Sequence, residues 1–309
     1  MSTATDTFVH EGLFYHDEED YLAGTVPFLE AAVAAGQPAL VAVPGSNLKR
    51  IRSALGPAAH QVRFADMTVA GRNPGRIIPW VLHAFIAEHP GTHPHIIGEP
   101  IWAERTAEEY AAAAQHDALI NAAFAGRAAT ILCPYDASRL GFRALIEAER
   151  THPILVRSGH RWASPEYAPF DIVAAHNRPL PAPAGPVVSQ AFDDPAALAG
   201  LRRLAAEQAH LAGFADSRIV DLEIAVTELA TNSLVHAGTG GVLRIWRIPG
   251  GLACEVEDCG RLTDPLAGRL PPPDHKPGGR GLLIVNHVAD LVRIHAGEDS
   301  SRVRLYLYR

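Results

Sequence analysis

The sequence is poor in cysteine and lacks both a secretory leader and a long apolar run. Its three cysteines, Cys133, Cys254 and Cys259, are odd in number and form no CxxC pair. A disulfide framework or a cysteine-rich zinc site is therefore not expected, and a reducing compartment fits best. No basic segment followed by an apolar one opens the chain, and no run of about 18 apolar residues occurs. We therefore predict a cytoplasmic protein with no membrane partner.

The charge balance is acidic. The chain has 27 basic and 34 acidic residues, which gives a formal net charge of −7. Proteins that bind polyanions usually carry an excess of basic residues on one face or helix. We therefore expect no direct nucleic-acid partner, and the absence of a basic recognition helix opposes a DNA-binding regulator.

Length and a proline-rich stretch predict two domains. The 309 residues correspond to about two domains of ordinary size, and 48 % apolar with 20 % charged residues is typical of globular chains. Prolines at positions 179, 181, 183 and 186 fall close together and favour an extended spacer. We predict a first domain over 1–176, a linker over 177–188 and a second domain over 189–309.

The first domain alternates short apolar runs with helical patterns. Gly36 ends the first expected helix, and Pro44 with Gly45 closes the first expected strand. Repetition of strand, helix and strand predicts an α/β fold, in which helices cover a parallel sheet. The expected strands are 39–43, 62–65, 95–98 and 128–132, and the expected helices are 21–35, 47–55, 79–88 and 107–124.

The second domain has a different order of elements. Asp194 and Pro195 predict the N-cap and first residue of a helix that ends near 211, and Asp216 is expected to cap a longer helix to 236. Expected strands follow at 242–248, 252–257, 291–295 and 302–307, with one more helix at 281–288. This order predicts an α+β fold with helices on one face of a mixed sheet.

The longer helix carries a carboxylate and an amide on one stripe. Glu228 and Asn232, at positions i and i+4, lie side by side. Their neighbouring stripe is the expected core face, formed by Ile219, Leu222, Val226, Leu229 and Ser233. Oxygen donors of this kind bind Mg²⁺ jointly with nucleotide phosphates, and a carboxylate can act as a general base. The alternative is a partly exposed polar strip at a helix edge.

Two further motifs follow along the chain. Asp258-Cys-Gly260 stands at the end of an expected strand, where a carboxylate can accept from an exocyclic amine and glycine lets a flat ring approach. Glycines 278, 279 and 281 precede the expected helix 281–288, so free backbone amides there favour phosphate. Either motif alone is also compatible with an ordinary turn. The glycines match neither the P-loop nor the dinucleotide-binding fingerprint.

The three motifs together resemble a known family. Segments 228–237, 258–260 and 279–282, in this order, resemble the N, G1 and G2 boxes of the GHKL ATPase superfamily. The short first box is similar to that of the anti-sigma regulatory factors, which are serine/threonine kinases of partner-switching systems. The resemblance covers about 192–309. It implies a GHKL, or Bergerat, ATPase sandwich of helices on a mixed sheet, with ATP and Mg²⁺ as cofactors.

The resemblance also implies a role for each matching residue. Glu228 would be the catalytic base or a water-mediated magnesium contact, Asn232 would hold magnesium, and Asp258 beside Gly260 would receive the adenine amino group. Segment 261–278 would form a mobile lid. In place of the family's usual Gly-Thr before the last strand the chain has Ser300-Ser301, so Ser301 is expected to supply the hydroxyl. The phosphates would lie against Gly279, Arg280, Gly281 and Leu282.

The first domain resembles the MEDS sensory domain over about 10–167. The matching phrases include Gly98-Glu-Pro-Ile-Trp102, 116–121 and Leu132-Cys-Pro-Tyr-Asp136, and the family implies an α/β fold akin to RecA-type ATPases. Because strand C-termini in parallel sheets line a crevice, we predict one sensory pocket. Its expected residues are Glu99, Trp102, Asn121, Cys133, Tyr135 and Asp136. In the alternative, Trp102 and Tyr135 are core or rim packing and Asp136 is a helix N-cap.

Metal binding is not favoured at two places where it could be considered. His89, His93 and His95 lie close in sequence, but Pro90 and Pro94 break any helix that would place them on one face. Cys133 is expected to be a buried apolar cysteine rather than a redox or metal-binding thiol.

Combined, the resemblances imply a signalling regulator. A sensory domain with an unknown small-molecule ligand would control an ATP-dependent anti-sigma kinase. Such a kinase phosphorylates a serine or threonine of an antagonist protein and alternatively sequesters a sigma factor; a homodimer is possible. The alternative is a non-catalytic, ATP-dependent switch that binds its partner without phosphorylating it.

Overall fold

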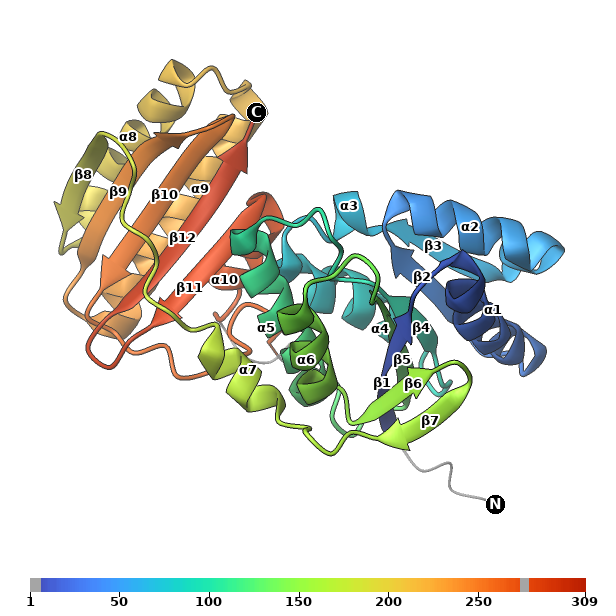
Figure 1. The fold of residues 1–309 in the computed structure, drawn as a ribbon. Helices are drawn as coiled ribbons and strands as arrows, with labels where there is room; N and C mark the ends of the chain where they lie inside the picture. The colour runs from blue at the N-terminus through green and yellow to red at the C-terminus, as the bar shows by residue number, and fades with distance from the viewer. Residues whose placement is uncertain (1–6, 273–277) are drawn as a thin grey trace. The chain divides into compact units, whose positions relative to one another are not determined.

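The computed structural model describes residues 7–272 and 278–309. The chain divides between His176 and Asn177 into two compact units. Each unit has its own sheet and its own helices (Figure 1). No helix within the described residues is long and apolar enough to span a bilayer.

The first unit is built on a seven-stranded sheet in the order β3-β2-β4-β5-β1-β6-β7. Neighbouring strands are parallel from β3 to β6, and β7 joins β6 as an antiparallel hairpin. The parallel sheet covered by helices is therefore confirmed, and the likeness to RecA-type ATPases stays a prediction. The strands are β1 (Phe8–Tyr15), β2 (Ala39–Val43), β3 (Val62–Asp66), β4 (His95–Gly98), β5 (Ala129–Asp136), β6 (Ile154–Arg157) and β7 (His160–Ala163).

Helices cover both faces of this sheet (Figure 1). On one face, Leu13 and Tyr15 of β1 join the apolar core formed with α1 and α2. Alternate residues of a strand face opposite ways, so His10 and Cys133 face α5 on the other side. The helices are α1 (Glu18–Ala34), α2 (Gly45–Leu55), α3 (Met67–Ala70), α4 (Ala84–Ala87), α5 (Ala107–Ala123), α6 (Phe142–Thr151) and α7 (Pro169–Ala175), with η1 (Gly56–Gln61), η2 (Pro74–Arg76) and the π-helix η3 (Ile77–His83). The helix expected at 79–88 is thus a π-helical turn continued by α4.

The second unit is a five-stranded sheet in the order β11-β12-β10-β9-β8. Every pairing between its described strands is antiparallel, so the expectation of a mixed sheet is wrong. Two of the connections are short turns, between β9 and β10 and between β11 and β12, and a short turn makes the strands it joins antiparallel. Gly250 lies in the first of these turns, where its φ of 75° suits glycine. The strands are β8 (Val187–Phe192), β9 (Gly241–Ile248), β10 (Gly251–Asp258), β11 (Leu291–Ala296) and β12 (Ser301–Tyr308).

Three helices cover one face of this second sheet, as the sequence predicts. Asp194 accepts from the Ala196 amide and starts the first helix as expected. Asp216 is not a cap: Ala215 is the N-cap, and Asp216 lies in the first turn, where its charge favours the helix dipole. The helices are η4 (Pro195–Ala197), α8 (Leu198–Leu211), α9 (Asp216–Asn232), the π-helix η5 (Ser233–Ala237) and α10 (Gly281–Val288).

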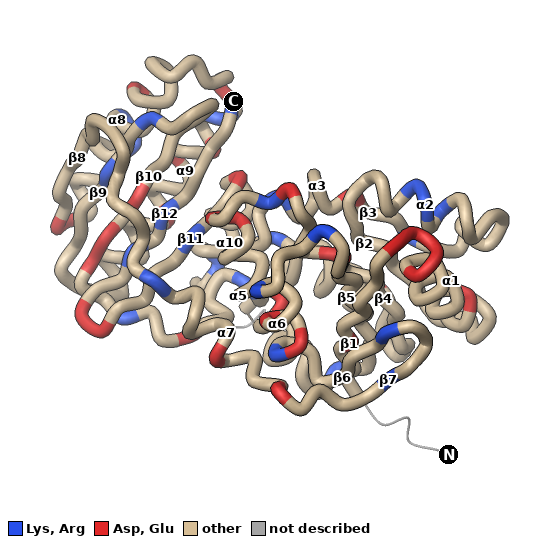
Figure 2. Tube along the Cα trace, viewed as in Figure 1, with Lys and Arg blue, Asp and Glu red and all other residues tan. Residues whose placement is uncertain are grey.

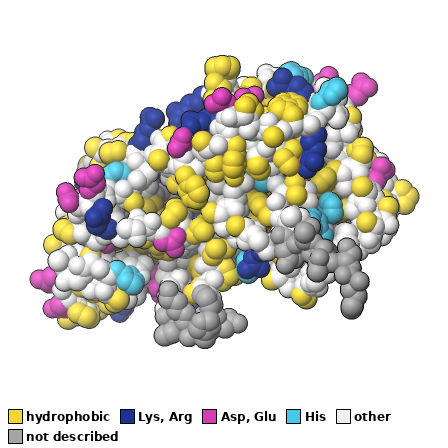
Figure 3. Space-filling model, turned by 90° about the horizontal axis from the view of Figure 1, so that it is seen from below, with side chains coloured by type: hydrophobic (Ala, Val, Ile, Leu, Met, Phe, Trp, Pro, Cys, Tyr) yellow, Lys and Arg dark blue, Asp and Glu magenta, His cyan; other side chains and the backbone are white. Residues whose placement is uncertain are grey.

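Charged residues of β9, β10 and β12 form ion pairs on the opposite face of the second sheet. Figure 2 shows where acidic and basic residues lie along these strands. The buried Arg304 of β12 donates from Nε and Nη2 to Glu255 of β10 at 2.9 and 2.6 Å. Glu257, two residues further along β10, pairs with Arg244 and Arg302 on the neighbouring strands. On the face drawn in Figure 3, basic and acidic side chains of the described residues are interspersed rather than gathered by sign.

The proline-rich segment packs on this charged face. The side chain of Asn177 donates to the Ala296 carbonyl and accepts from the Ala296 amide, each at 2.9 Å. Arg304 Nη2 donates to the Pro181 carbonyl at 2.8 Å, and Leu180 is buried. Proline lacks an amide donor but keeps its acceptor, so this segment can hold on to a sheet without joining it. Strand β8 begins at Val187, inside the range expected to be linker.

Candidate functional site

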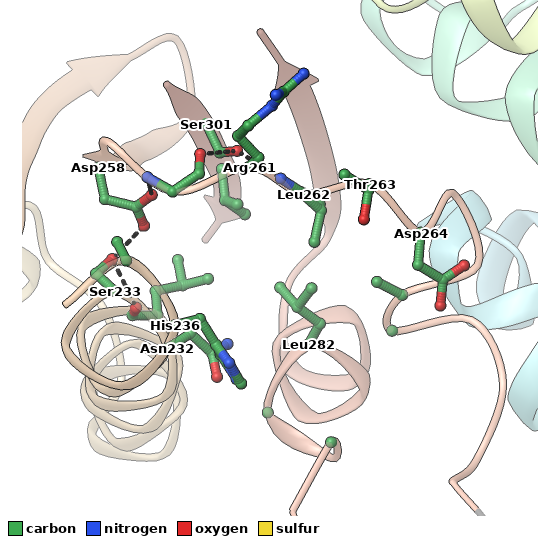
Figure 4. Close-up of a pocket in the computed structure, with 18 of the residues that line it drawn as sticks. Asn232, Ser233, His236, Asp258, Arg261, Leu262, Thr263, Asp264, Leu282 and Ser301 are labelled. Carbon is green, nitrogen blue, oxygen red and sulfur yellow. Dashed lines mark hydrogen bonds between the residues drawn. The ribbon is translucent and has the colours of Figure 1, made fainter. Parts of the chain in front are cut away.

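A cleft of about 820 Å³ opens in the second unit. Its walls come from the end of α9, the end of β10, the start of β12, the segment after β10 and the start of α10 (Figure 4). Clefts of roughly 300–1,000 Å³ are typical of small-molecule sites. Seven residues predicted from the sequence lie among the described lining residues: Asn232, Asp258, Gly260, Gly279, Gly281, Leu282 and Ser301. Glu228 and Arg280 are outside that set.

Glu228 nevertheless lies directly against the cleft's edge. A Cβ built on Gly281 would stand 2.8 Å from Glu228 Oε2 and 3.1 and 3.2 Å from Asn232 Nδ2 and Oδ1. The carboxylate and the amide of α9 thus meet the first residue of α10, as their i and i+4 spacing allows. Only glycine leaves this space open. The side-chain oxygens of Glu228 and Asn232 therefore lie beside the unobstructed backbone of Gly281.

Asp258 is held at the other end of the cleft by two hydrogen bonds. Ser233 Oγ donates to Oδ2 at 2.5 Å, and the Gly260 amide donates to Oδ1 at 2.8 Å. Both oxygens keep a second lone pair for a ligand. A Cβ on Gly260 would stand 3.0 Å from Ala237 Cβ, so glycine permits the close approach of the two segments.

The long helix ends in a widened turn that begins at Ser233, the partner of Asp258. Residues Ser233–Ala237 form a π-helix, and the Gly238 amide donates to the Ser233 carbonyl at 3.2 Å. A π-turn inserts one extra residue into a helix and is common at functional sites. Sequence reasoning placed Ser233 only on the core stripe, because nothing in the local pattern distinguishes a widened turn from a regular one.

Ser301 is engaged within the protein. Its hydroxyl donates to the Gly260 carbonyl at 2.8 Å and accepts from the Leu262 amide at 3.1 Å. The side chain therefore fixes the backbone that follows Asp258 (Figure 4). Since its one hydrogen is used here, Ser301 contributes to the cleft by positioning this loop.

The glycine-rich segment enters α10 from the side of the cleft. Gly278 and Gly279 have φ of 80° and 79°, a region that side chains other than glycine rarely adopt. The first amides of α10 have no partner within the helix, and such amides attract anions. Arg280 is the N-cap of α10, and Leu282 contacts the position where Gly268 would carry a Cβ.

The segment expected to be a lid is partly described. Residues 261–272 line the cleft over much of their length, and Asn286 of α10 donates to the Gly268 carbonyl at 3.0 Å. Residues 273–277 of the expected lid lie outside the described residues.

Comparison with known proteins identifies both halves of the chain. Residues 9–153 match the family model MEDS (MEthanogen/methylotroph, DcmR Sensory domain), and residues 192–307 match the model of the histidine kinase-like ATPase domain. The chain joins a MEDS domain to a histidine kinase-like ATPase domain. Both resemblances drawn from the sequence are therefore confirmed at the level of these families.

Comparison with solved structures gives a distant match. The crystal structure of the RsbU and RsbW domains of Rv1364c from Mycobacterium tuberculosis matches with a TM-score of 0.32 and 19% identity. The match covers 40% of this chain and 32% of that one, so this chain spans about a third of its neighbour. No curated protein matches the chain.

The six residues expected to form a sensory pocket are divided between the two faces of the MEDS domain's sheet. Glu99 and Asp136 lie on the side of α1, whereas Cys133 and Tyr135 face α5. Asn121 bonds His10 on the α5 side, with Oδ1 at 3.1 Å from His10 Nδ1. Trp102 lies under the Arg105 guanidinium, whose Cζ is 3.7 Å from the ring centroid. The structure therefore does not gather the six in one pocket.

Glu99 forms a small buried polar cluster of its own. Asn47 Nδ2 lies 3.0 and 2.8 Å from the two carboxyl oxygens, and the Tyr21 hydroxyl lies 3.5 Å from Oε2. Burial raises the pKa of Glu99 to about 8, and the nearby Asp136 carboxylate acts in the same direction. Asp136 itself accepts from the Ser138 and Arg139 amides, so it caps a turn that precedes α6.

The histidine-rich loop holds its side chains through separate partners. His89 Nδ1 bonds the Phe85 carbonyl at 2.8 Å, His93 Nε2 bonds Thr130 Oγ1 at 2.8 Å, and His95 Nδ1 bonds the His93 carbonyl at 3.0 Å. The His93 contact ties the loop to β5, whereas the other two are local contacts within the helix end and the loop.

Proposed function

We propose that the chain is a signalling regulator in which the MEDS domain controls an ATP-dependent anti-sigma kinase. The observation that carries this proposal is convergence. Three motifs separated by 20 or more residues in sequence, at Asn232, Asp258 and Gly281, line one cleft of about 820 Å³. A nucleoside triphosphate needs recognition at both its base and its phosphates, and the cleft offers suitable groups at its two ends.

The residues present fit ATP and Mg²⁺. Asp258 has spare lone pairs for the adenine amino group, and the first amides of α10 suit the phosphates. Asn232 and Glu228 offer the oxygen donors that Mg²⁺ prefers, and the missing Cβ of Gly281 leaves room between them. When bound, Mg²⁺ would neutralise phosphate charge. All of these donors belong to the ATPase domain, and together they support the proposal.

For the kinase reaction, Glu228 would act as general base. A serine or threonine hydroxyl of an antagonist protein would give its proton to Glu228. The oxygen of that hydroxyl would bond to the γ-phosphorus of ATP, while the bond between the γ-phosphorus and ADP breaks. Positioning and charge neutralisation supply most of the catalysis in such transfers.

The partners of this proposal follow from the same cycle. The ATPase domain would bind either a sigma factor or the antagonist protein, so that the two compete, and a homodimer is part of the same proposal. A small-molecule ligand of the MEDS domain would shift this balance only if it binds two states of the protein with different affinity.

Phosphotransfer separates the kinase from the alternative switch. The full chain is incubated with radiolabelled ATP, Mg²⁺ and a candidate antagonist, and label on the antagonist is measured. We expect transfer by the wild type, loss in Glu228→Ala and retention in Glu223→Ala, a matched change earlier on α9. Transfer that survives Glu228→Ala would contradict the assignment of the base.

One observation favours the second candidate, a non-catalytic ATP-dependent switch. Glu228 lies beside the cleft but outside the set of described residues that line it. If the wild type binds MgATP and a partner yet transfers no label to any candidate antagonist, the switch is the better description.

A further inference from the structure

Four potential metal ligands meet in the interior of the MEDS domain. His10 of β1, Asp117 of α5, Cys133 of β5 and His152 at the end of α6 are all buried. One ligand atom from each lies within 4.8 Å of every other. Four separate elements therefore deliver two imidazoles, a carboxylate and a thiol to a single point.

A second ring of contacts orients three of these side chains. Asn121 Oδ1 lies 3.1 Å from Nδ1 of His10, and the Ala148 carbonyl lies 2.8 Å from Nδ1 of His152. Both histidines therefore present Nε2 to the cluster. The Tyr135 hydroxyl donates to Asp117 Oδ2, which leaves Oδ1 facing inward. Outer contacts of this kind, to the second ring nitrogen and the second carboxylate oxygen, typically accompany metal ligands.

Three of the distances between the inward atoms match those of a tetrahedral site, and the remaining ones are no longer than 4.8 Å. His10 Nε2 lies 3.3 Å from Cys133 Sγ and 3.8 Å from Asp117 Oδ1, and His152 Nε2 also lies 3.8 Å from Asp117 Oδ1. Zinc bonds of about 2.0–2.3 Å place neighbouring ligand atoms of a tetrahedron roughly 3.3–3.8 Å apart. The cluster can therefore close on an ion with little movement of the backbone.

Two of the inward atoms have no hydrogen-bond partner among the described residues. Among the residues that the structure describes, Asp117 Oδ1 and His152 Nε2 are fully buried without a hydrogen-bond partner. Unsatisfied buried polar atoms are uncommon in folded proteins and call for a specific explanation, such as an ion. An ion at the centre would satisfy both atoms at once.

The backbone also makes room for this arrangement. A Cβ built on Gly12 of β1 would stand 3.1 Å from His152 Cγ and 3.2 Å from its Nδ1. Gly12 pairs in register with Cys133 on β5, so the smallest residue stands beside the thiol and lets the ring of His152 approach the sheet.

We propose that His10, Asp117, Cys133 and His152 form a closed, four-ligand site for a divalent transition metal of the zinc class. Mixed nitrogen, sulfur and oxygen donors in a tetrahedron suit zinc, whereas calcium and magnesium prefer oxygen alone. Four protein ligands leave no open position, so the ion is structural and ties two strands to two helices. Because the ligands are buried, the ion enters while the domain folds.

Metal content and cobalt spectra test the site in the full chain. Protein expressed in zinc-supplemented medium is passed through metal-free buffer and its zinc is measured by mass spectrometry. The same chain is refolded with Co²⁺. We expect one equivalent of tightly held zinc, visible bands of tetrahedral cobalt and a near-ultraviolet band from a single thiolate bound to cobalt.

Matched variants decide which residues hold the ion. Cys133→Ser should abolish the thiolate–cobalt band, whereas Cys254→Ser, which changes a buried cysteine of the other domain, should keep it. His152→Gln should lower the zinc content several-fold, and His60→Gln, at an exposed position, should not. If a ligand variant fails to fold, X-ray absorption of the zinc-loaded wild type still reports whether one sulfur is bound.

Three results would overturn the proposal. A folded wild type that takes up neither ion, on expression or on refolding, would make the cluster a hydrogen-bonded core. A thiolate–cobalt band that survives Cys133→Ser would place the ion elsewhere. Equal zinc in the wild type and in a folded His152→Gln would indicate an adventitious ion only.

Discussion

Replacing Asp258 by asparagine tests base recognition with little change in shape. In the wild type, one carboxyl oxygen accepts from Ser233 and the other from the Gly260 amide. Asparagine keeps one acceptor, which can serve Gly260. Its amino group can donate to Ser233 Oγ, whose hydrogen then turns fully to the Leu229 carbonyl, 3.2 Å away. The protein without nucleotide should therefore be almost as stable as the wild type.

Nucleotide binding should suffer more than folding. The new amino group faces the adenine amino group, so a hydrogen bond to a charged acceptor, worth about 1.5–3 kcal/mol, is lost. That loss raises Kd about 10- to 100-fold. In thermal melting with MgATP at about 100 times the wild-type Kd, the wild type gains roughly 2.7 kcal/mol. The variant should gain only about 0.4–1.4 kcal/mol under the same conditions.

Two controls make this result specific. Asp299→Asn removes one negative charge from an exposed turn and should keep the full shift. GTP should stabilise the wild type far less than ATP, because guanine offers a carbonyl oxygen where adenine offers an amine. A full ATP shift in Asp258→Asn, or equal shifts with ATP and GTP in the wild type, would refute the assignment of Asp258.

Three further predictions concern other parts of the chain. Gly281→Ala places a Cβ 2.8 Å from Glu228 Oε2 and should abolish most of the MgATP melting shift. The stability without nucleotide should change by no more than about 1 kcal/mol, because alanine favours helices. An unchanged melting shift would mean that nothing binds at this edge of the cleft. Burial raises the pKa of Glu99 to about 8 from 4.5, so the folded state keeps a proton that the unfolded chain releases, and stability falls as pH rises through this window. Urea unfolding should show Glu99→Gln gaining on the wild type between pH 5 and 9, by at most about 5 kcal/mol, and parallel pH profiles would contradict the shift. Arg304→Met leaves the buried Glu255 carboxylate with a 3.4 Å contact to an arginine of β9. In urea unfolding this change should lower the free energy of unfolding by about 3–5 kcal/mol, and adding Glu255→Leu should largely restore it. A small loss in the single variant would show that the Glu255 charge reaches solvent.

Much of the fold follows from local pattern. Strand β2 has the predicted bounds, since an unbroken apolar run is closed by Pro44 and Gly45. Helix α10 also has its predicted bounds and follows directly after the glycine-rich segment. Strand β1 escapes prediction because His10, Glu11 and Gly12 interrupt its apolar character. Strand β8 is an edge strand with much exposed side-chain surface after a proline run, so periodicity says little about it. The direction of strands in the second sheet depends on the connections between them, both short turns and helical segments, rather than on strand composition.

The nucleotide site and the MEDS cluster differ in how well each can be predicted from the sequence. The nucleotide motifs are short and contiguous, so each can be read within a few residues, and their order identifies the family. The MEDS cluster has no such signal: His10 and His152 are 142 positions apart in the printed numbering. Each of its members alone is an ordinary core residue. Only the pairing of β1 with β5, and the helices laid across them, brings the four side chains together.

The widened turn at the end of α9 limits how this protein can be engineered. Deleting one residue from Ser233–Ala237 would restore a regular helix, and regular helices are an attractive target for raising thermal tolerance. The deletion would also rotate every later residue by about 100° and displace the end of the turn, where Ala237 lies against Gly260 beside Asp258. A more heat-stable variant obtained by this deletion should no longer bind nucleotide.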